Sequence, residues 1–463
     1  MKSFVRNGII KNSSIDTIKG VQFKMYWFII MFPLLIYPWG FDPYYTTIKT
    51  DYLYLFVIGT WLYLLFKRKY RLLLPAKRDS AVELTLLILL VLIEISTALS
   101  KYTYTAVHGS LDRCEGLITY FCYFSVFLFS YRLINIKKVT TLFSGIAAVS
   151  CVVSIYGILQ HYSLDFLPRN SAMRNYTGTY TFFDNPNFFG SYLVLVILLT
   201  LTIYLTTNQS KATFLYFMTI CLSFIALIFS NTRSAYLGVF FGTIILTLFV
   251  VVKRKYLWKR WLTLLLTLGL LLFAVNITEN GSYFNRINSV VTDSVSVASN
   301  QSTGHEGSSR FFIWKKSLPL VKDYFWLGSG PDTFEFIFPA TPKELKEFLG
   351  NPNTKVDKAH NEYLQIAITL GTPALLIYLV FIFLVLRKSF HAVRKTQGTD
   401  SIILYGLIAT IFGYLIQAFF NISTVPVAPI FWSILGISMS KASLHLKNEK
   451  TKEEKIGDYY RSA

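Results

Sequence analysis

The sequence predicts an all-α polytopic membrane protein with about 12 transmembrane helices and one large polar loop. The chain is 53% hydrophobic and only 15% charged, with a mean hydropathy of +0.46. A soluble globule could not bury that much apolar surface. Apolar runs of about 20 residues, the length that crosses about 30 Å of hydrocarbon, recur along the chain. A single long polar segment, residues 276–360, interrupts their series.

These runs divide the chain into five parts. A polar tail precedes a first group of runs, the long polar segment separates this group from a second one, and a basic tail ends the chain. The apolar runs lie at residues 25–41, 50–66, 82–99, 116–134, 139–160, 186–207, 211–230, 233–252, 257–275, 361–386, 401–420 and 424–440. The predicted parts are 1–24 (N-terminal tail), 25–275 (nine transmembrane helices), 276–360 (loop), 361–440 (three transmembrane helices) and 441–463 (C-terminal tail).

The placement of the basic residues predicts the orientation. With the N-terminus inside, the inner segments and tails carry 30 of the 45 lysines and arginines, and the short outer loops carry six. Positive charge concentrates on the cytoplasmic side of membrane proteins. Both termini are therefore predicted to be cytoplasmic, and the long polar segment to be extracytoplasmic. The net charge of +20 is explained by orientation and by contact with anionic membrane lipid, so we expect no nucleic-acid partner.

Several classes of protein are disfavoured by what the sequence lacks. It contains no Walker-type G-x-x-x-x-G-K, no G-x-G-x-x-G and no D-x-D of the kind that holds a metal–nucleotide-sugar, so neither an energy-coupled pump nor an enzyme that uses a cytoplasmic nucleotide sugar is favoured. The six histidines are scattered and no H-E-x-x-H occurs, so no metal site is expected. The four cysteines are too dispersed for a disulfide framework.

The long polar segment has an internal pattern. Residues 276–309 are rich in Ser, Asn and Thr, which predicts a mobile approach. Residues 308–322 have helical periodicity, with Phe311, Trp314 and Leu318 on one amphipathic stripe. We expect this helix to be capped by one of its first two serines and to lie along the membrane surface.

Two arginines are candidate anion ligands at the outer boundary. Arg233 follows a very short link between two apolar runs, where its guanidinium and the helix N-terminus both favour an anion. The structural alternative is an arginine that extends to the interface. Arg310 opens the amphipathic helix of the loop, where its charge opposes the macrodipole, an unfavourable interaction that a bound phosphate would offset. The alternative is a basic surface helix that contacts lipid headgroups.

His360 is the candidate base. It begins the tenth apolar run, and a helix N-terminus lowers the pKa of an imidazole, which favours the neutral, proton-accepting form near pH 7. Asp357 or Glu362 could orient it. The alternative is a surface histidine at the interface.

Together these segments resemble a known family. The strings NTRSAYLG, SSRFFIWKKSL, WLGSGPDTF and HNEYLQIAITLG follow one another in that order, preceded by DRCEGLITY and GTYTFFDNPNFFGSYL. Their order, spacing and topology resemble the O-antigen ligase/polymerase family of bacterial envelope enzymes. The similarity covers most of residues 85–440, with the ligase-related region at about residues 190–380.

The resemblance implies a GT-C-type fold in a bacterial cell membrane. It implies transfer of a glycan from undecaprenyl diphosphate to an acceptor on the outer face, with inversion and without metal or cofactor. By motif, Arg233 and Arg310 would hold the diphosphate and His360 would help to deprotonate the acceptor hydroxyl. Three further arginines would add positive charge to the same diphosphate site: Arg113, Arg169 and Arg174. Other polysaccharide-assembly proteins are possible partners.

Two asparagines in DNPNFFG, Asn185 and Asn187, match a signature of the family. The structural alternative is that Asp184 caps the sixth apolar run and Pro186 starts it.

The acceptor stays open at this level. A ligase attaches the glycan to a lipid or wall acceptor, a polymerase adds it to another lipid-linked repeat, and a third kind of enzyme transfers it to a protein hydroxyl. The rival class is a flippase or exporter that moves lipid-linked glycan without bond chemistry. Sparse charges within the apolar runs count against that class, since coupled transporters usually keep several there.

Overall fold

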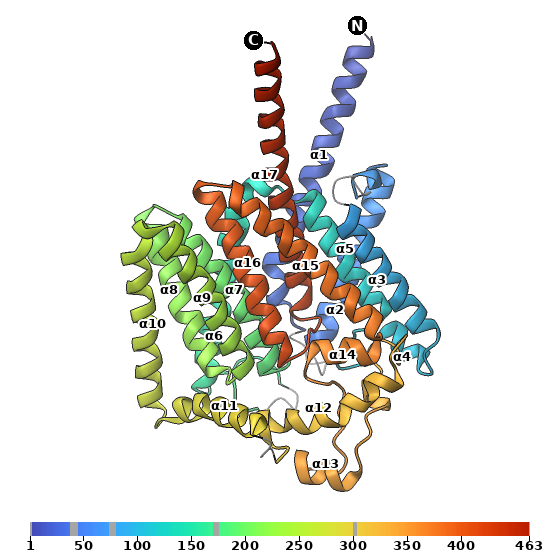
Figure 1. Cartoon of the computed structure of the whole chain (residues 1–463), viewed down its shortest axis with the longest axis vertical. Helices are drawn as coiled ribbons and strands as arrows, with labels where there is room; N and C mark the ends of the chain where they lie inside the picture. Colours follow the sequence, from blue (N-terminus) through green and yellow to red (C-terminus); the bar gives the residue numbers. More distant parts are fainter. Residues whose placement is uncertain (1, 38–44, 74–79, 170–175, 300–302, 463) are drawn as a thin grey trace.

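The computed structural model describes residues 2–37, 45–73, 80–169, 176–299 and 303–462, and these residues contain helices, turns and loops but no strand. Both termini leave the bundle at one end, here called the terminal end, and the opposite end, the loop end, carries α4 and α11 to α14 (Figure 1). The α-helices are α1 (Lys2–Met31), α2 (Tyr45–Phe66), α3 (Ser80–Ala98), α4 (Thr103–His108), α5 (Leu117–Leu133), α6 (Val139–His161), α7 (Pro186–Thr206), α8 (Ser210–Phe229), α9 (Arg233–Lys253), α10 (Trp258–Thr278), α11 (Ser282–Ala298), α12 (Glu306–Asp323), α13 (Pro342–Leu349), α14 (Glu362–Thr369), α15 (Thr372–Lys395), α16 (Gly398–Phe419) and α17 (Ala428–Ser462).

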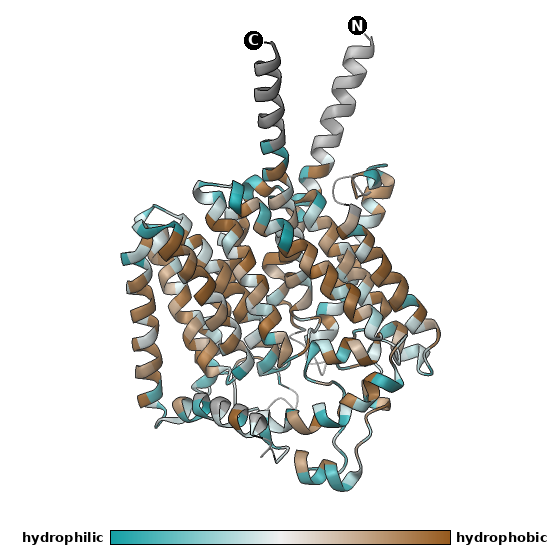
Figure 2. Cartoon of the chain, viewed as in Figure 1, coloured by the Kyte–Doolittle hydropathy of each residue, from teal (hydrophilic) through white to brown (hydrophobic). Residues whose placement is uncertain are grey.

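The predicted class, an all-helical membrane protein, is confirmed. Within the described residues, eight helices are long and apolar enough to cross a membrane: α3, α6, α7, α8, α9, α10, α15 and α16. Figure 2 shows their apolar residues as a broad band between the two ends of the bundle. The described residues of the other four predicted runs coincide with parts of α1, α2, α17 and the shorter apolar helix α5, and residues 38–41 of the first run lie outside the described residues. The total of about 12 stays a prediction.

Helix α7 forms the centre of the bundle. Every residue from Phe188 to Leu205 is buried, because α6, α8, α9 and α16 all pack against it. Glycines allow the close approach on one side, as is common where membrane helices pack. A Cβ added to Gly413 of α16 would lie 2.6 Å from a methyl of Leu198, and one added to Gly238 of α9 would lie 2.6 Å from the carbonyl oxygen of Gly413. This packing holds the N-terminus of α7 at the loop end.

The entry to α7 differs from the prediction in one respect. Pro186 does start the helix, but Asn185 is the N-cap residue, and its Oδ1 accepts a hydrogen bond of 2.8 Å from the backbone N–H of Asn187. Asp184 instead accepts hydrogen bonds from the backbone N–H groups of Tyr45 and Thr46 at the start of α2. Its carboxylate thus satisfies the free N–H groups of a distant helix.

The predicted apolar run 361–386 is two helices. The short α14 ends at Thr369, and α15 begins at Thr372 after Gly371, whose φ is +95°. A side chain at Gly371 would also collide with the carbonyl oxygen of Trp326, 2.6 Å from its Cβ position. Glycine tolerates both constraints. The membrane-spanning helix is therefore Thr372–Lys395, and α14 lies at the loop end.

The polar segment is more helical than predicted. An amphipathic helix, α11, occupies Ser282–Ala298 where we expected a mobile approach. Helix α12 takes its regular course from Arg310, because Gly307, Ser308 and Ser309 all have positive φ, so the predicted serine cap is absent.

The predicted apolar stripe of α12 is not the face that the helix packs against the protein. The apolar side chains that α12 buries are Phe312, Ile313 and Leu320, whereas Leu318 of the stripe is 62% exposed, and the contact of the stripe with the membrane surface stays a prediction. These apolar side chains are buried because α12 packs against α13 and α14 on that face.

Candidate active site

Three chain segments meet beside the N-terminus of α7: the start of α9, the start of α12 and the turn at residues 357–361. The start of α9 is held by Thr232, whose Oγ1 donates a hydrogen bond of 2.9 Å to the carbonyl oxygen of Pro186. Gly190 makes room for it, since a Cβ there would lie 2.7 Å from Cβ of Thr232. Arg233 is the next residue, in the first turn of α9, where the helix N-terminus favours an anion.

Arg233 links α9 to the polar segment. Its Nη1 donates hydrogen bonds of 2.9 Å to Ser289 Oγ and to Asp293 Oδ2, both on α11. Its Nη2 donates a hydrogen bond of 2.8 Å to Ser308 Oγ on the left-handed stretch before α12. The guanidinium therefore has one carboxylate partner, which an incoming anion would have to replace.

Arg310 has no such partner. Its Nη2 donates a 3.4 Å hydrogen bond to Asn187 Oδ1 at the start of α7, and none of the described carboxylates lies within ion-pair distance. Loss of solvent and the nearby charge of Arg233 lower the pKa of Arg310 to about 10. The side chain stays protonated at neutral pH, so the site contains a half-buried positive charge without a counter-ion among the described residues. Such a charge is costly unless an anion pairs with it.

Both guanidinium groups line one cavity of about 390 Å³, here called the cationic cavity, between α9, α11 and α12. Its wall also includes Phe311, Trp314 and Phe420. Arg233 and Leu237 line a second, almost entirely apolar cavity of about 520 Å³ between α8, α9 and α10, here called the lateral groove. The other walls of the lateral groove are Phe224, Leu227, Ile228, Tyr236, Val239, Phe240, Thr243, Leu268, Leu272 and Tyr283. The cationic cavity and the lateral groove thus share one arginine, Arg233.

The turn at residues 357–361 is fixed by ion pairs, one of them half-buried and the others buried. Asp357 pairs with Arg113, whose guanidinium carbon lies 5.3 Å from the ring centre of Phe188 on α7. Nζ of Lys358 lies 2.8 Å from Glu115 Oε2 and 2.8 Å from Asp332 Oδ1, and all three side chains are at most 6% exposed. The motifs DRCEGLITY and WLGSGPDTF thus supply the ion-pair partners of Asp357 and Lys358, which precede the candidate base.

The backbone of the turn is held as well. The carbonyl oxygen of Ala359 accepts a hydrogen bond of 2.9 Å from Trp314 Nε1 of α12, and its N–H donates to Gln365 Oε1 at 2.8 Å. Asn361, not His360, is the N-cap residue of α14, since its Oδ1 accepts from the N–H of Leu364 at 3.0 Å.

His360 lies between these fixed residues in a left-handed conformation, with a φ of +50° that non-glycine residues seldom adopt. Its Nδ1 is buried and has no hydrogen-bond partner among the described residues. Burial first, and then the charge of Arg310, lower the pKa of His360 to about 4, although Asp357 acts in the opposite direction. The imidazole is therefore neutral at pH 7, as predicted, but burial and Arg310 are the cause instead of a helix N-terminus.

The structure places the predicted site residues in three groups. Arg233, Arg310 and His360 belong to one cluster, and Arg113 reaches it through Asp357 and by its charge, which also lowers the pKa of His360. Arg169 lies elsewhere, paired with Asp165 and hydrogen-bonded to the carbonyl oxygen of Thr181 at 2.7 Å. Arg174 lies outside the described residues.

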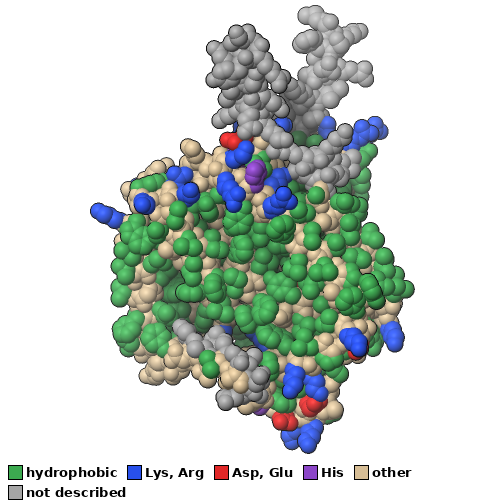
Figure 3. Space-filling model, in the orientation of Figure 1, with side chains coloured by type: hydrophobic (Ala, Val, Ile, Leu, Met, Phe, Trp, Pro, Cys, Tyr) green, Lys and Arg blue, Asp and Glu red, His purple; other side chains and the backbone are tan. Residues whose placement is uncertain are grey.

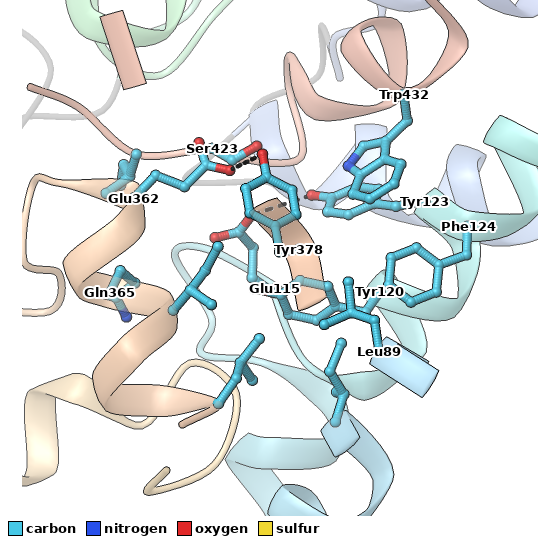
Figure 4. Close-up of a pocket in the computed structure, with 14 residues that line it drawn as sticks. Leu89, Glu115, Tyr120, Tyr123, Phe124, Glu362, Gln365, Tyr378, Ser423 and Trp432 are labelled. Atoms are coloured by element: carbon cyan, nitrogen blue, oxygen red, sulfur yellow. Dashed lines mark hydrogen bonds between the residues drawn. The ribbon is translucent and has the colours of Figure 1, made fainter. Parts of the chain in front are cut away.

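Sequence reasoning named Glu362 as a possible partner of His360 but missed that Glu362 lies with Glu115 as a buried pair of carboxyl groups beside the turn. Figure 4 shows Glu115 and Glu362 among Tyr120, Tyr123 and Tyr378. All five residues line a small cavity of about 30 Å³. Glu362 Oε1 accepts a hydrogen bond of 3.2 Å from the Tyr378 hydroxyl, and Oε2 has no partner among the described residues. Burial, reinforced by Glu115, raises the pKa of Glu362 to about 8. The available signal was that both glutamates lie within the quoted motifs.

A bundle of apolar helices with two arginines in one cavity at its loop end defines a polytopic membrane protein with a cationic site outside its apolar band. The O-antigen ligase family model matches residues 218–379, from within α8 to within α15, and this stretch contains Arg233, Arg310 and His360. The resemblance found in the motifs is therefore confirmed for this region. It supports a membrane enzyme of glycan transfer. No curated protein matches the chain.

Proposed function

We propose that this protein is an integral-membrane glycosyltransferase of the GT-C type. It transfers a glycan from undecaprenyl diphosphate to an acceptor hydroxyl, as an O-antigen ligase or polymerase does. The observation that carries the proposal is Arg310, a half-buried arginine that has no counter-ion among the described residues and lies in the same cavity as Arg233. A diphosphate would supply the missing negative charge, and guanidinium groups bind phosphate oxygens with strong, charge-assisted hydrogen bonds.

The lateral groove supports a donor with a long apolar chain. It lies between α8, α9 and α10, three of the membrane-spanning helices, and it shares Arg233 and Leu237 with the cationic cavity. A polyprenyl chain in this groove would bring its diphosphate to the two arginines. Burial of the chain would provide affinity, and the arginines would provide position.

The proposed reaction is a single displacement. The acceptor oxygen attacks the anomeric carbon as the bond from that carbon to the diphosphate oxygen breaks, which inverts the configuration. The leaving diphosphate takes the bonding electron pair, and Arg233 and Arg310 stabilise its growing charge. The acceptor proton passes to the neutral imidazole of His360. Arginines supply all the positive charge in this scheme, so transfer is expected to be metal-independent and to persist in a chelator.

The loop end would face away from the cytoplasm, as the distribution of basic residues predicts. The protein would then act at the outer face of a bacterial cell membrane, where lipid-linked glycans are presented. Acceptors compatible with the site include a lipid, a growing polysaccharide, or a wall or protein hydroxyl. Mass spectrometry of surface polymers from a deletion strain separates these activities, because shortened chains indicate a polymerase and intact but unattached chains a ligase.

The direct test uses purified protein in detergent with a glycan carried on undecaprenyl diphosphate. We expect product from the wild type, and a loss of about 10²- to 10³-fold for Arg233→Ala or Arg310→Ala. His360→Ala is expected to lose about 10²- to 10⁴-fold. Lys315→Ala is the matched control, because Lys315 is an exposed cation on α12 near Arg310.

Normal transfer by all three site variants would refute the assignment. An inert donor in detergent, together with glycan scrambling in vesicles, would identify a flippase instead.

A further inference from the structure

A row of basic side chains occupies the terminal half of α15, far from the candidate active site. Arg387, His391 and Arg394 are separated by four and three residues, so they lie on one face of the helix. All three are exposed, and no ion pair joins them to any acidic side chain of the described residues. Figure 3 shows the wider setting, a concentration of Lys and Arg around the terminal end of the molecule.

These residues line a groove of about 700 Å³ between α3, α15, α16 and α17. Lys388 lines the groove as well, and the remaining walls are apolar and include Val82 on α3, Phe412 on α16 and Met439 on α17. Phe383 lies one helical turn before Arg387 on α15, which is toward the middle of the membrane, and it is 60% exposed. The groove is thus basic near the end of the span and apolar deeper along it.

We propose that this groove binds an anionic phospholipid of the leaflet at the terminal end. The headgroup phosphate would lie against Arg387 and Arg394, because guanidinium groups bind phosphate oxygens through paired hydrogen bonds. An acyl chain would follow Phe383 and the apolar walls, which at this depth have no water to contact. A soluble anion would satisfy the arginines but would leave those walls uncovered, so the depth of the groove favours a lipid.

The site is independent of the proposed transferase activity. It lies near the end of α15 that is opposite to α14 and the turn at residues 357–361. Basic pockets between transmembrane helices on the predicted cytoplasmic side are typical binding sites for anionic headgroups. Such a lipid would bridge α3 and α15 and would help to hold α15, the membrane-spanning helix that follows α14.

The test measures lipid retention by native mass spectrometry of the full chain released from nanodiscs. The nanodiscs contain equal parts of phosphatidylglycerol and phosphatidylcholine with matched acyl chains. We expect the wild type to retain phosphatidylglycerol selectively, and the double variant Arg387→Gln/Arg394→Gln to retain it about tenfold less for each lost contact. The control is Lys253→Gln/Lys255→Gln, which removes two exposed charges from the terminal end of α9 and the loop after it.

Equal loss of phosphatidylglycerol in the two double variants would overturn the proposal, since it would reflect overall charge alone. Equal retention of the two lipids by the wild type would overturn it as well, as would displacement of the lipid by inorganic phosphate. A second measurement places the acyl chain: in Phe383→Trp, brominated phosphatidylglycerol should quench the tryptophan fluorescence more than brominated phosphatidylcholine does. Equal quenching by both would contradict the proposed site.

Discussion

Asp293 should compete with the donor for Arg233. Its Oδ2 accepts hydrogen bonds from Arg233 Nη1 at 2.9 Å and from the N–H of Gly307 at 3.0 Å, so the carboxylate occupies an anion position at the edge of the cationic cavity. A diphosphate that binds Arg233 has to displace it. We predict that Asp293→Asn tightens the binding of a polyprenyl diphosphate, because the competing charge is removed while the shape is kept.

The size of the effect follows from exposure. The side chains of Arg233 and Asp293 are 19% and 30% exposed, so solvent screens the pair. Ion pairs of this kind are worth about 0.2–1 kcal/mol, which corresponds to an affinity gain of about 1.4- to 5-fold.

The assay is calorimetric titration of purified protein with farnesyl diphosphate, a short soluble member of the same class. Asp323→Asn is the control, since it removes an exposed charge at the far end of α12. Weaker binding by Asp293→Asn would refute the reasoning, because it would mean that the carboxylate orients Arg233 for the ligand instead of competing with it.

Three further predictions concern the turn and its surroundings. The pKa of His360 is about 4, so its imidazole is neutral at any higher pH. We therefore expect kcat/KM for transfer to stay level between about pH 5 and 8 and to fall only toward pH 4. A fall centred near pH 6.5 would contradict the buried setting of the imidazole. In the unfolded chain the Glu362 carboxyl ionises above its ordinary pKa of 4.5, whereas in the folded protein it keeps its proton up to about pH 8. Its contribution to the free energy of unfolding is therefore fully present below pH 4.5 and is lost as the pH rises through 8. Glu362→Gln should therefore raise the melting temperature in detergent more at pH 9 than at pH 5, with the exposed Glu347→Gln as control, and an equal shift at both pH values would argue against this. Lys358→Met should destabilise the fold by about 3–5 kcal/mol, because it leaves the buried Glu115 carboxylate without its positive partner. The double variant Lys358→Met/Glu115→Gln should recover part of the lost melting temperature. If it recovers none, the pairing of Lys358 with Glu115 is contradicted.

The helices of the bundle could be predicted from the sequence because a membrane leaves few alternatives. Backbone groups in hydrocarbon must be satisfied within the segment, so a long apolar run such as that of α7 has to be helical. The juxtaposition of Arg233, Arg310 and His360 was expected from the order of the family motifs. Spacing alone would not have brought together residues so far apart in the chain.

The remaining features depend on contacts between distant segments. Asp184 satisfies the N-terminus of α2, which no local pattern indicates. The break before α15 depends on Gly371 and on the carbonyl oxygen of Trp326 behind it, whereas the apolar composition continues unchanged through the break. The pairing of Lys358 with Glu115 and Asp332 joins three loops, each of which reads as ordinary polar sequence by itself.

The complete enclosure of α7 has a mechanical consequence for the site. Bilayers differ in thickness, and membrane helices accommodate the mismatch by tilting, which is easiest for those that border lipid. The peripheral α10 can lean with the bilayer, but α7 is clasped by protein from Phe188 to Leu205 and cannot follow it. Asn187, in the first turn of α7, therefore holds Arg310 at a position that does not shift when the surrounding lipid changes. The spacing between Arg310 and His360 should then be the same in thin and thick membranes.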